Sequence, residues 1–138
     1  MIVCLDTGLL LRGVEGSPAV RASVIDLIQE VEGSPGGVVI ASAMAYAECM
    51  VKPVRFGDQG RVREFEAFFE NSGVVLVEIT RDVLTEAVRV RAHKGLKMPD
   101  ALQVATAIVS GCSLIVSTDS DIVKAGPYGA LQARAFPA

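Results

Sequence analysis

Short runs of apolar residues alternate along the chain with longer stretches in which apolar positions recur every three or four residues. The short runs are rich in β-branched residues and lack strict alternation, which is typical of strands buried on both faces. The longer stretches have the period of amphipathic helices. This order predicts an α/β fold, a three-layer α/β/α domain with a mostly parallel central sheet of four to five strands. The expected strands are 2–5, 38–41, 74–79 and 114–116, with a weaker candidate at 130–135.

Capping and turn residues predict where the helices begin and end. Ser17 and Pro18 favour a helix start, because the hydroxyl caps an unpaired N–H and proline fits the first turn. Gly95 is an expected C-terminal cap, and Pro53 is expected to end the helix before it. No repeat or linker divides the chain, which predicts one domain over residues 1–138. The expected helices are 18–32, 42–51, 58–71, 81–94 and 99–110.

Composition narrows the class of protein. The 138 residues are 51% hydrophobic and 21% charged, which excludes a disordered chain. A formal charge of -3 argues against coating nucleic acid by bulk positive charge. No apolar run is long enough to cross a membrane, and the first residues lack the features of a signal peptide. Three widely spaced cysteines suit buried thiols in a reducing cytoplasm, so we expect a cytoplasmic protein without membrane contact.

Several acidic residues follow the expected strands. Asp6 follows the first strand, and Asp119 and Asp121 follow the fourth. Such an acid is often a turn former or a helix N-cap. In open α/β sheets, however, ligands bind at the carboxyl ends of the strands. Two strand exits with acids therefore favour a ligand site at this edge of the sheet.

Two further acids lie in apolar helices. Glu48 needs a partner there, either Lys52 four residues later or a metal ion. Asp100 lies in the first turn of its helix, where the helix dipole alone would favour a negative charge. Clustered carboxylates repel one another unless a cation neutralises them, and oxygen ligands select Mg²⁺ or Mn²⁺. The single histidine, His93, argues against a zinc site or a Ser–His–Asp site.

Four segments, in the same order along the chain, resemble the PIN domain family, and VapC-type toxins of toxin–antitoxin pairs in particular. The first is an apolar strand that ends in Asp-Thr, and the second is an Ala-Tyr-Ala-Glu step in a helix. The third resembles the family's G-L-x-x-P-D-A-x-x-x-A-T-A run, and the fourth its closing L-V-T-x-D-x-D. These segments are residues 2–7, 45–48, 95–107 and 114–121.

The resemblance implies a metal-dependent endoribonuclease, the toxin of a type II pair, that hydrolyses RNA phosphodiester bonds with Mg²⁺ or Mn²⁺. It also implies a homodimer and a cognate antitoxin. Residue by residue, the catalytic and metal-binding acids fall on Asp6, Glu48, Asp100 and Asp119, with Asp121 as an auxiliary metal ligand. Thr7, Ser117 and Thr118 would orient water or substrate phosphate. The chain departs from the family pattern at Gly8, in place of Asn or Ser, and at Ile122, in place of Phe.

Basic residues offer a candidate surface for RNA. No acid occurs between residues 87 and 99, directly before the third acidic position. Phosphate contacts from such residues position a nucleic acid on its partner. The expected substrate-binding residues are Arg12, Arg81, Arg89, Arg91, Lys94 and Lys97.

Three other interpretations stay open at this point. The Asp-Thr-Gly step at residues 6–8 also occurs in aspartic proteases, which are β-rich. A catalytically degenerate PIN domain would act as a binding module. A structure-specific DNA nuclease would use the same metal chemistry.

Overall fold

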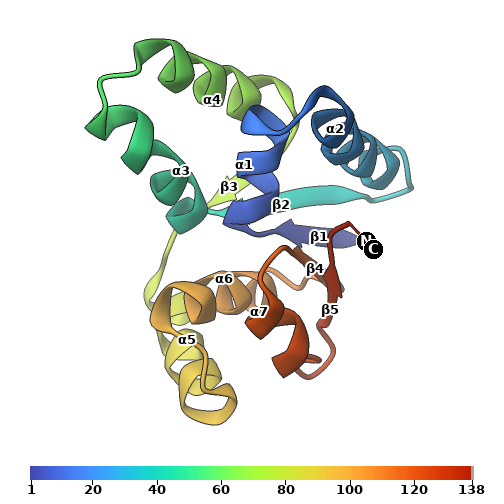
Figure 1. Cartoon of the computed structure of the whole chain (residues 1–138). Coiled ribbons are helices and arrows are strands. Elements are labelled where there is room, and N and C mark those ends of the chain that lie inside the picture. Colours follow the sequence, from blue (N-terminus) through green and yellow to red (C-terminus); the bar gives the residue numbers. More distant parts are fainter. Residues whose placement is uncertain (138) are drawn as a thin grey trace.

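The computed structural model describes residues 1–137, and residue 138 lies outside them. Within this range the strands form one sheet in which every pair is parallel. Helices cover both faces of the sheet, so the predicted three-layer α/β/α architecture is confirmed (Figure 1). The strands are β1 (Ile2–Leu5), β2 (Val38–Ser42), β3 (Val75–Val77), β4 (Leu114–Ser117) and β5 (Gln132–Ala135).

The helices divide between the two faces of the sheet. Each set packs on its own cluster of buried apolar residues. No helix among residues 1–137 combines the length and apolarity that a bilayer crossing requires. One face carries α1 (Thr7–Glu15), α2 (Pro18–Glu32), α3 (Ala43–Arg55) and α4 (Gln59–Asn71) (Figure 1). The other carries α5 (Arg81–Lys94), α6 (Met98–Val109) and α7 (Ser120–Ala125).

The order of the strands creates a position suited to a ligand. The sheet runs β3-β2-β1-β4-β5, so the chain builds outward from β1 on one side and later returns to its other side. The order therefore reverses between β1 and β4, which is where open α/β sheets bind ligands at their carboxyl ends. Asp6 and Asp119 follow these two strands directly or within two residues.

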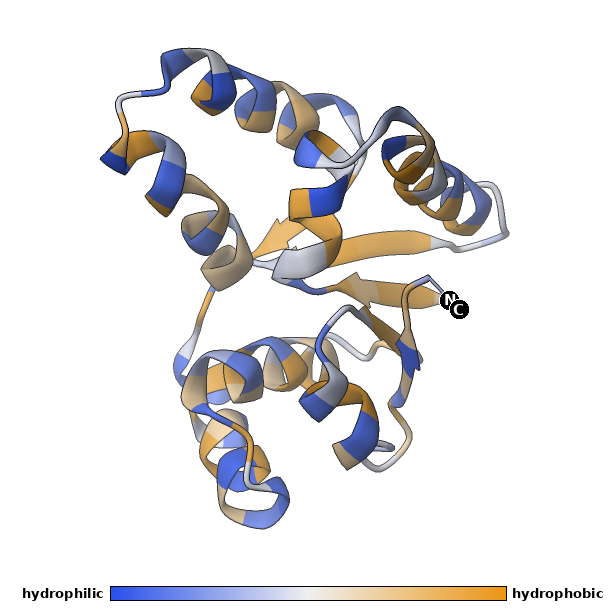
Figure 2. Ribbon diagram, in the orientation of Figure 1, coloured by the Kyte–Doolittle hydropathy of each residue, from blue (hydrophilic) through white to orange (hydrophobic). Residues whose placement is uncertain are grey.

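The central strands are buried on both faces, which explains why their sequences do not alternate. Val3 and Leu5 of β1 face the layer of α1–α4, whereas Cys4 faces the other layer. The hydrophobic colouring of the strands runs through the middle of the molecule, and most hydrophilic residues lie on the helices (Figure 2). The three cysteines are buried and unbridged, as predicted. Burial raises the pKa of the Cys4 thiol well above its usual value.

Two helices, α1 and α7, were not predicted from the apolar pattern. Each begins directly after an aspartate that caps it. The Asp6 carboxylate accepts from the Leu9 N–H at 3.1 Å, and the Asp119 carboxylate accepts from the Asp121 N–H at 2.8 Å. Both aspartates therefore act as helix N-caps, which is a common role for an acid that follows a strand.

The predicted boundaries differ most from the structure at α3 and β3. Helix α3 continues through Pro53 to Arg55. The proline lies in the last turn, where it removes one backbone hydrogen bond, and the Phe56 N–H still donates to the Lys52 carbonyl at 3.1 Å. Strand β3 is shorter than the expected 74–79, because it is an edge strand that pairs only with β2 and ends with it.

Replacement of Phe65 by alanine tests the α1–α4 layer. This side chain on α4 is fully buried, so the loss of its packing is expected to lower the free energy of unfolding by about 3–5 kcal/mol. Urea denaturation followed by circular dichroism measures the change. Phe56→Ala is the matched control, because Phe56 is 70% exposed, and its effect should stay within about 0.5 kcal/mol. Equal effects of both variants would contradict the assigned core.

Candidate active site

Asp6 lies at the carboxyl end of β1 and is only 3% exposed. One carboxylate oxygen accepts from Leu9 of α1, and the other accepts from the Thr118 N–H at 3.1 Å and from the Ser117 hydroxyl. Burial raises the pKa of Asp6, while these hydrogen bonds lower it. The predicted supporting residues Ser117 and Thr118 therefore contact the first predicted metal ligand, and they join the ends of β1 and β4.

Ser117 also contacts the second acid at this edge. Its oxygen accepts from the Asp119 N–H at 2.9 Å while its hydroxyl proton is donated to Asp6. The backbone N–H of Asp121 donates to the Asp119 carboxylate, whereas the Asp121 side chain is exposed. One buried hydroxyl thus holds two of the predicted acids in fixed relation to each other.

Glu48 reaches the same region from α3. Its Oε1 accepts from the Thr7 hydroxyl at 2.7 Å and from the Gln103 side-chain amide at 3.2 Å. Among residues 1–137 it makes no ion pair with Lys52, the local partner considered from the sequence. Thr7, which was predicted to orient water or substrate phosphate, therefore contacts Glu48 in this structure.

Gln103 was not predicted from the sequence as a residue of the site. It lies on α6, is 4% exposed, and its Oε1 accepts from the Thr7 N–H at 3.0 Å. The residues next to it in the sequence, Leu102 and Val104, are apolar and buried, so it is a buried amide in a mainly apolar helix. A buried amide needs hydrogen-bond partners, and this signal would have identified it as a residue of interest.

Asp100 is half-buried in the first turn of α6. Burial and the negative charges of other acids raise the pKa of Asp100 to about 6. The direction shows that desolvation and repulsion outweigh the favourable helix dipole. The acids that repel it are Asp119, Glu48, Asp121 and Asp6, in decreasing order. All five predicted acids therefore share one electrostatic environment.

The chemistry of this cluster suits a hard divalent cation. Every candidate ligand is a carboxylate oxygen, and their mutual repulsion is relieved by a bound positive charge. Within residues 1–137 no three acidic, histidine or cysteine side chains are already grouped as metal ligands. Asp6 is buried and held, but Glu48 and Asp121 are exposed.

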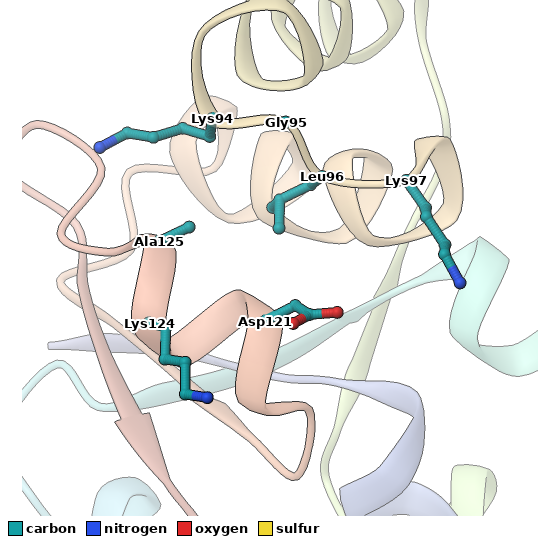
Figure 3. Close-up of a pocket in the computed structure, with 7 residues that line it drawn as sticks. All are labelled: Lys94, Gly95, Leu96, Lys97, Asp121, Lys124 and Ala125. Carbon is teal, nitrogen blue, oxygen red and sulfur yellow. The ribbon is translucent and has the colours of Figure 1, made fainter.

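The predicted basic residues separate into two groups. Lys94 and Lys97 line a cavity of about 410 Å³ together with Lys124, which the sequence had not singled out. The cavity lies between α7 and the loop before α6, and Asp121 also lines it (Figure 3). In the figure the three lysine side chains extend in different directions around Leu96. This cavity adjoins the acids because Asp121 contributes to both.

The four arginines have other surroundings. Arg12 donates to the Phe136 carbonyl at 3.2 Å, and Arg91 donates to the Leu96 carbonyl at 2.8 Å. Arg89 lies 3.5 Å from Glu86, and Arg81 is exposed at the first residue of α5. The structure brings none of them into the lysine-lined cavity.

Gly8 allows Thr118 to approach Asp6. A Cβ at residue 8 would lie 1.7 Å from the Thr118 hydroxyl oxygen and 2.9 Å from its Cβ. The other departure from the family pattern, Ile122, is 1% exposed in the core beside Tyr128. Both departures are therefore accommodated by packing.

The aspartic-protease interpretation of residues 6–8 is wrong. It requires a β-rich chain, whereas these residues join a parallel strand to a helix in an α/β sandwich.

Comparison with known proteins identifies the same fold. A family model described as PIN domain matches residues 3–126. The chain is similar to VapBC2 from Rickettsia felis, solved bound to a DNA fragment from its promoter, at 15% identity and a TM-score of 0.76, covering 99% of each chain. It is also similar to VapBC-1 from nontypeable Haemophilus influenzae, at 16% identity and a TM-score of 0.72, covering 100% of each chain. No curated protein matches.

A third solved structure has a described activity. VapC20 from Mycobacterium tuberculosis, described as a Sarcin-Ricin loop cleaving toxin, is similar at 20% identity and a TM-score of 0.63. The match covers 91% of this chain and 96% of that chain. At these identities the similarity establishes a shared fold.

Asp100→Asn is expected to stabilise the metal-free protein at neutral pH. The carboxyl has a pKa of about 6 when folded, against an ordinary value of 3.8, so ionisation destabilises the fold as pH rises from about 4 to 6. The half-exposed site is screened by solvent, and we expect a gain of about 1 kcal/mol at pH 7 that disappears below about pH 4. Urea denaturation in EDTA across this range measures it. A variant less stable than wild type at pH 7 would contradict the assigned repulsion.

Gly8→Ala is expected to lower the free energy of unfolding by about 1–3 kcal/mol, because the new methyl group overlaps Thr118. Thr118→Ala in the same chain should recover most of the loss, since it removes the overlapping hydroxyl. Gly60→Ala on α4 is the matched control, because the nearest atom to its Cβ would lie at 3.6 Å. Purely additive effects at residues 8 and 118, measured by urea denaturation, would rule out the contact.

Proposed function

Because this chain belongs to the PIN domain family, we propose that it is a metal-dependent endoribonuclease and the toxin of a type II toxin–antitoxin pair. The observation that carries the proposal is the convergence of five acids in one electrostatic environment, where burial and the charges of the other four raise the pKa of Asp100 to about 6. Such repulsion is costly in the absence of a cation and favours the binding of one. The fold shared with VapC20, a toxin described as cleaving the Sarcin-Ricin loop, supports RNA as the substrate.

The proposed reaction hydrolyses the bond between phosphorus and the 3′ oxygen. Water adds its hydroxyl to phosphorus and its second proton to the 3′ oxygen, which leaves 5′-phosphate and 3′-hydroxyl ends. A bound Mg²⁺ or Mn²⁺ supplies an activated water and offsets the charge of the leaving group. Asp6, Glu48, Asp100 and Asp119 hold the ion, and Asp121 assists them. Ser117 keeps Asp6 and Asp119 in register through its two hydrogen bonds.

RNA phosphates are proposed to lie along the lysine-lined cavity. Three lysines and one aspartate are among the residues that line this cavity, so its lining has a positive formal charge although the chain has a formal charge of -3. The cavity is continuous with the acids through Asp121. Single-stranded or loop RNA suits this position better than a duplex, because its backbone bends into a recessed site.

The proposed partners are a cognate antitoxin and a second copy of this chain. Two of the similar structures are VapBC proteins, which supports an antitoxin partner. The homodimer rests on the family resemblance.

Purified protein, freed of any antitoxin, should cleave RNA with Mg²⁺ or Mn²⁺ and stop with EDTA. Asp6→Asn and Asp100→Asn should each lower the rate at least ~100-fold, because even residues that only support metal ligands commonly cost 10–100-fold. Asp26→Asn, which changes an exposed acid on α2, is the matched control and should stay active. Gel analysis of a labelled RNA measures the rates, and circular dichroism checks the folds.

Two results would redirect the proposal. If wild type cleaves RNA no faster than Asp100→Asn does, the result would favour a catalytically degenerate domain that acts as a binding module. Cleavage of structured DNA but not RNA would favour the DNA nuclease.

A further inference from the structure

We infer that Gln103 is a positioning residue that fixes the Glu48 carboxylate for metal binding. The inference rests on the proposed function, since it assigns a role to a side chain beside a proposed metal ligand. Among residues 1–137 Gln103 makes no hydrogen bond to the other four acids, and it does not line the lysine-lined cavity. It acts through Glu48 and Thr7.

The orientation of the Gln103 amide follows from its partners. The Thr7 backbone N–H is a donor, so the atom 3.0 Å from it must be the amide oxygen. The amide nitrogen then lies 3.0 Å from the Thr7 hydroxyl and 3.2 Å from Glu48 Oε1. The nitrogen therefore lies within hydrogen-bond distance of two acceptors and the oxygen accepts one hydrogen bond, so no polar atom of the buried amide lacks a partner.

The three side chains form a closed ring. The Thr7 hydroxyl accepts from Gln103 and donates to Glu48 Oε1 at 2.7 Å. Glu48 Oε1 therefore receives two hydrogen bonds. Within residues 1–137 its second oxygen, Oε2, receives none, and it is the oxygen available to a cation.

The ring compensates for the position of Glu48. A glutamate that is exposed on a helix surface has several rotatable bonds and loses conformational freedom when it binds an ion. Two hydrogen bonds from α1 and α6 remove part of this freedom before the ion arrives. Because Gln103 is 4% exposed and its amide oxygen accepts from the Thr7 backbone N–H, its own amide is held in place. A rigid donor is what orients a metal ligand.

Calorimetric titration of the folded chain with Mn²⁺ alone tests the inference without RNA. Gln103→Met keeps the length of the side chain but removes the amide, and it should weaken Mn²⁺ binding about 10–100-fold. Gln29→Met, on the exposed face of α2, is the matched control and should bind like wild type. Binding of Gln103→Met within twofold of wild type would overturn the inference.

A double-mutant cycle separates a positioning role from a general effect on the fold. If Gln103 acts through Glu48, adding Gln103→Met to Glu48→Ala should weaken Mn²⁺ binding no further. Independent, multiplying losses would contradict the role.

A second pair of variants changes Thr7, the member of the ring on α1, and tests the inference if Gln103→Met does not fold. Thr7→Val removes the hydroxyl and should weaken Mn²⁺ binding in the same direction. Thr7→Ser keeps the hydroxyl and should bind like wild type. Thr7→Val with wild-type affinity would overturn the inference. A folded wild-type chain that binds no Mn²⁺ would instead overturn the proposed metal-dependent function.

Discussion

The buried carboxylate of Asp6 joins the two halves of the sheet at the point where the strand order reverses. It follows β1, caps α1 through the Leu9 N–H, and accepts two hydrogen bonds from Ser117 and Thr118 at the end of β4. Burial raises its pKa, and these donors offset the cost of the buried charge. The other acids are arranged around this fixed group: Asp119 is tied to it through one serine hydroxyl. A change at Asp6 therefore affects local structure and proposed chemistry together.

Charge in this molecule is organised locally. A formal charge of -3 is modest, yet burial and the charges of four other acids raise the pKa of Asp100 to about 6. Directly beside them, three lysines line one cavity. An acidic chain can therefore attract both a cation and a phosphate backbone, because screening in water confines the effect of each group to its neighbourhood. The net charge alone argued against coating nucleic acid by bulk positive charge, but it does not describe how the charges are distributed over the molecule.

The parts of the fold that were predicted correctly are those with long, regular patterns. The buried strands and the five longer helices follow from apolar periodicity, and the acids at strand exits follow from their order. The six-residue α7 is too short to show a period, and α1 continues an apolar stretch directly from β1. Pro53 was expected to end its helix, but it lies in the last turn, where its missing N–H costs one backbone hydrogen bond and the helix continues to Arg55. The departure from the family pattern at Gly8 has a tertiary explanation, because Thr118 fills the space beside it.

The sequence by itself determined the α/β class, the buried strands and the identities of the acids, because these depend on local periodicity and on residue chemistry. Only the tertiary structure decided which polar groups meet. Gln103 is separated by 96 residues from Thr7 and by 55 from Glu48, yet it bonds to both. Lys124 joins Lys94 and Lys97 around one cavity in the same way. Hydrogen bonds and charge pairs act over a few ångströms in space. The separation of two residues along the chain does not show whether they come this close, because the folding of the sheet and its helices decides it.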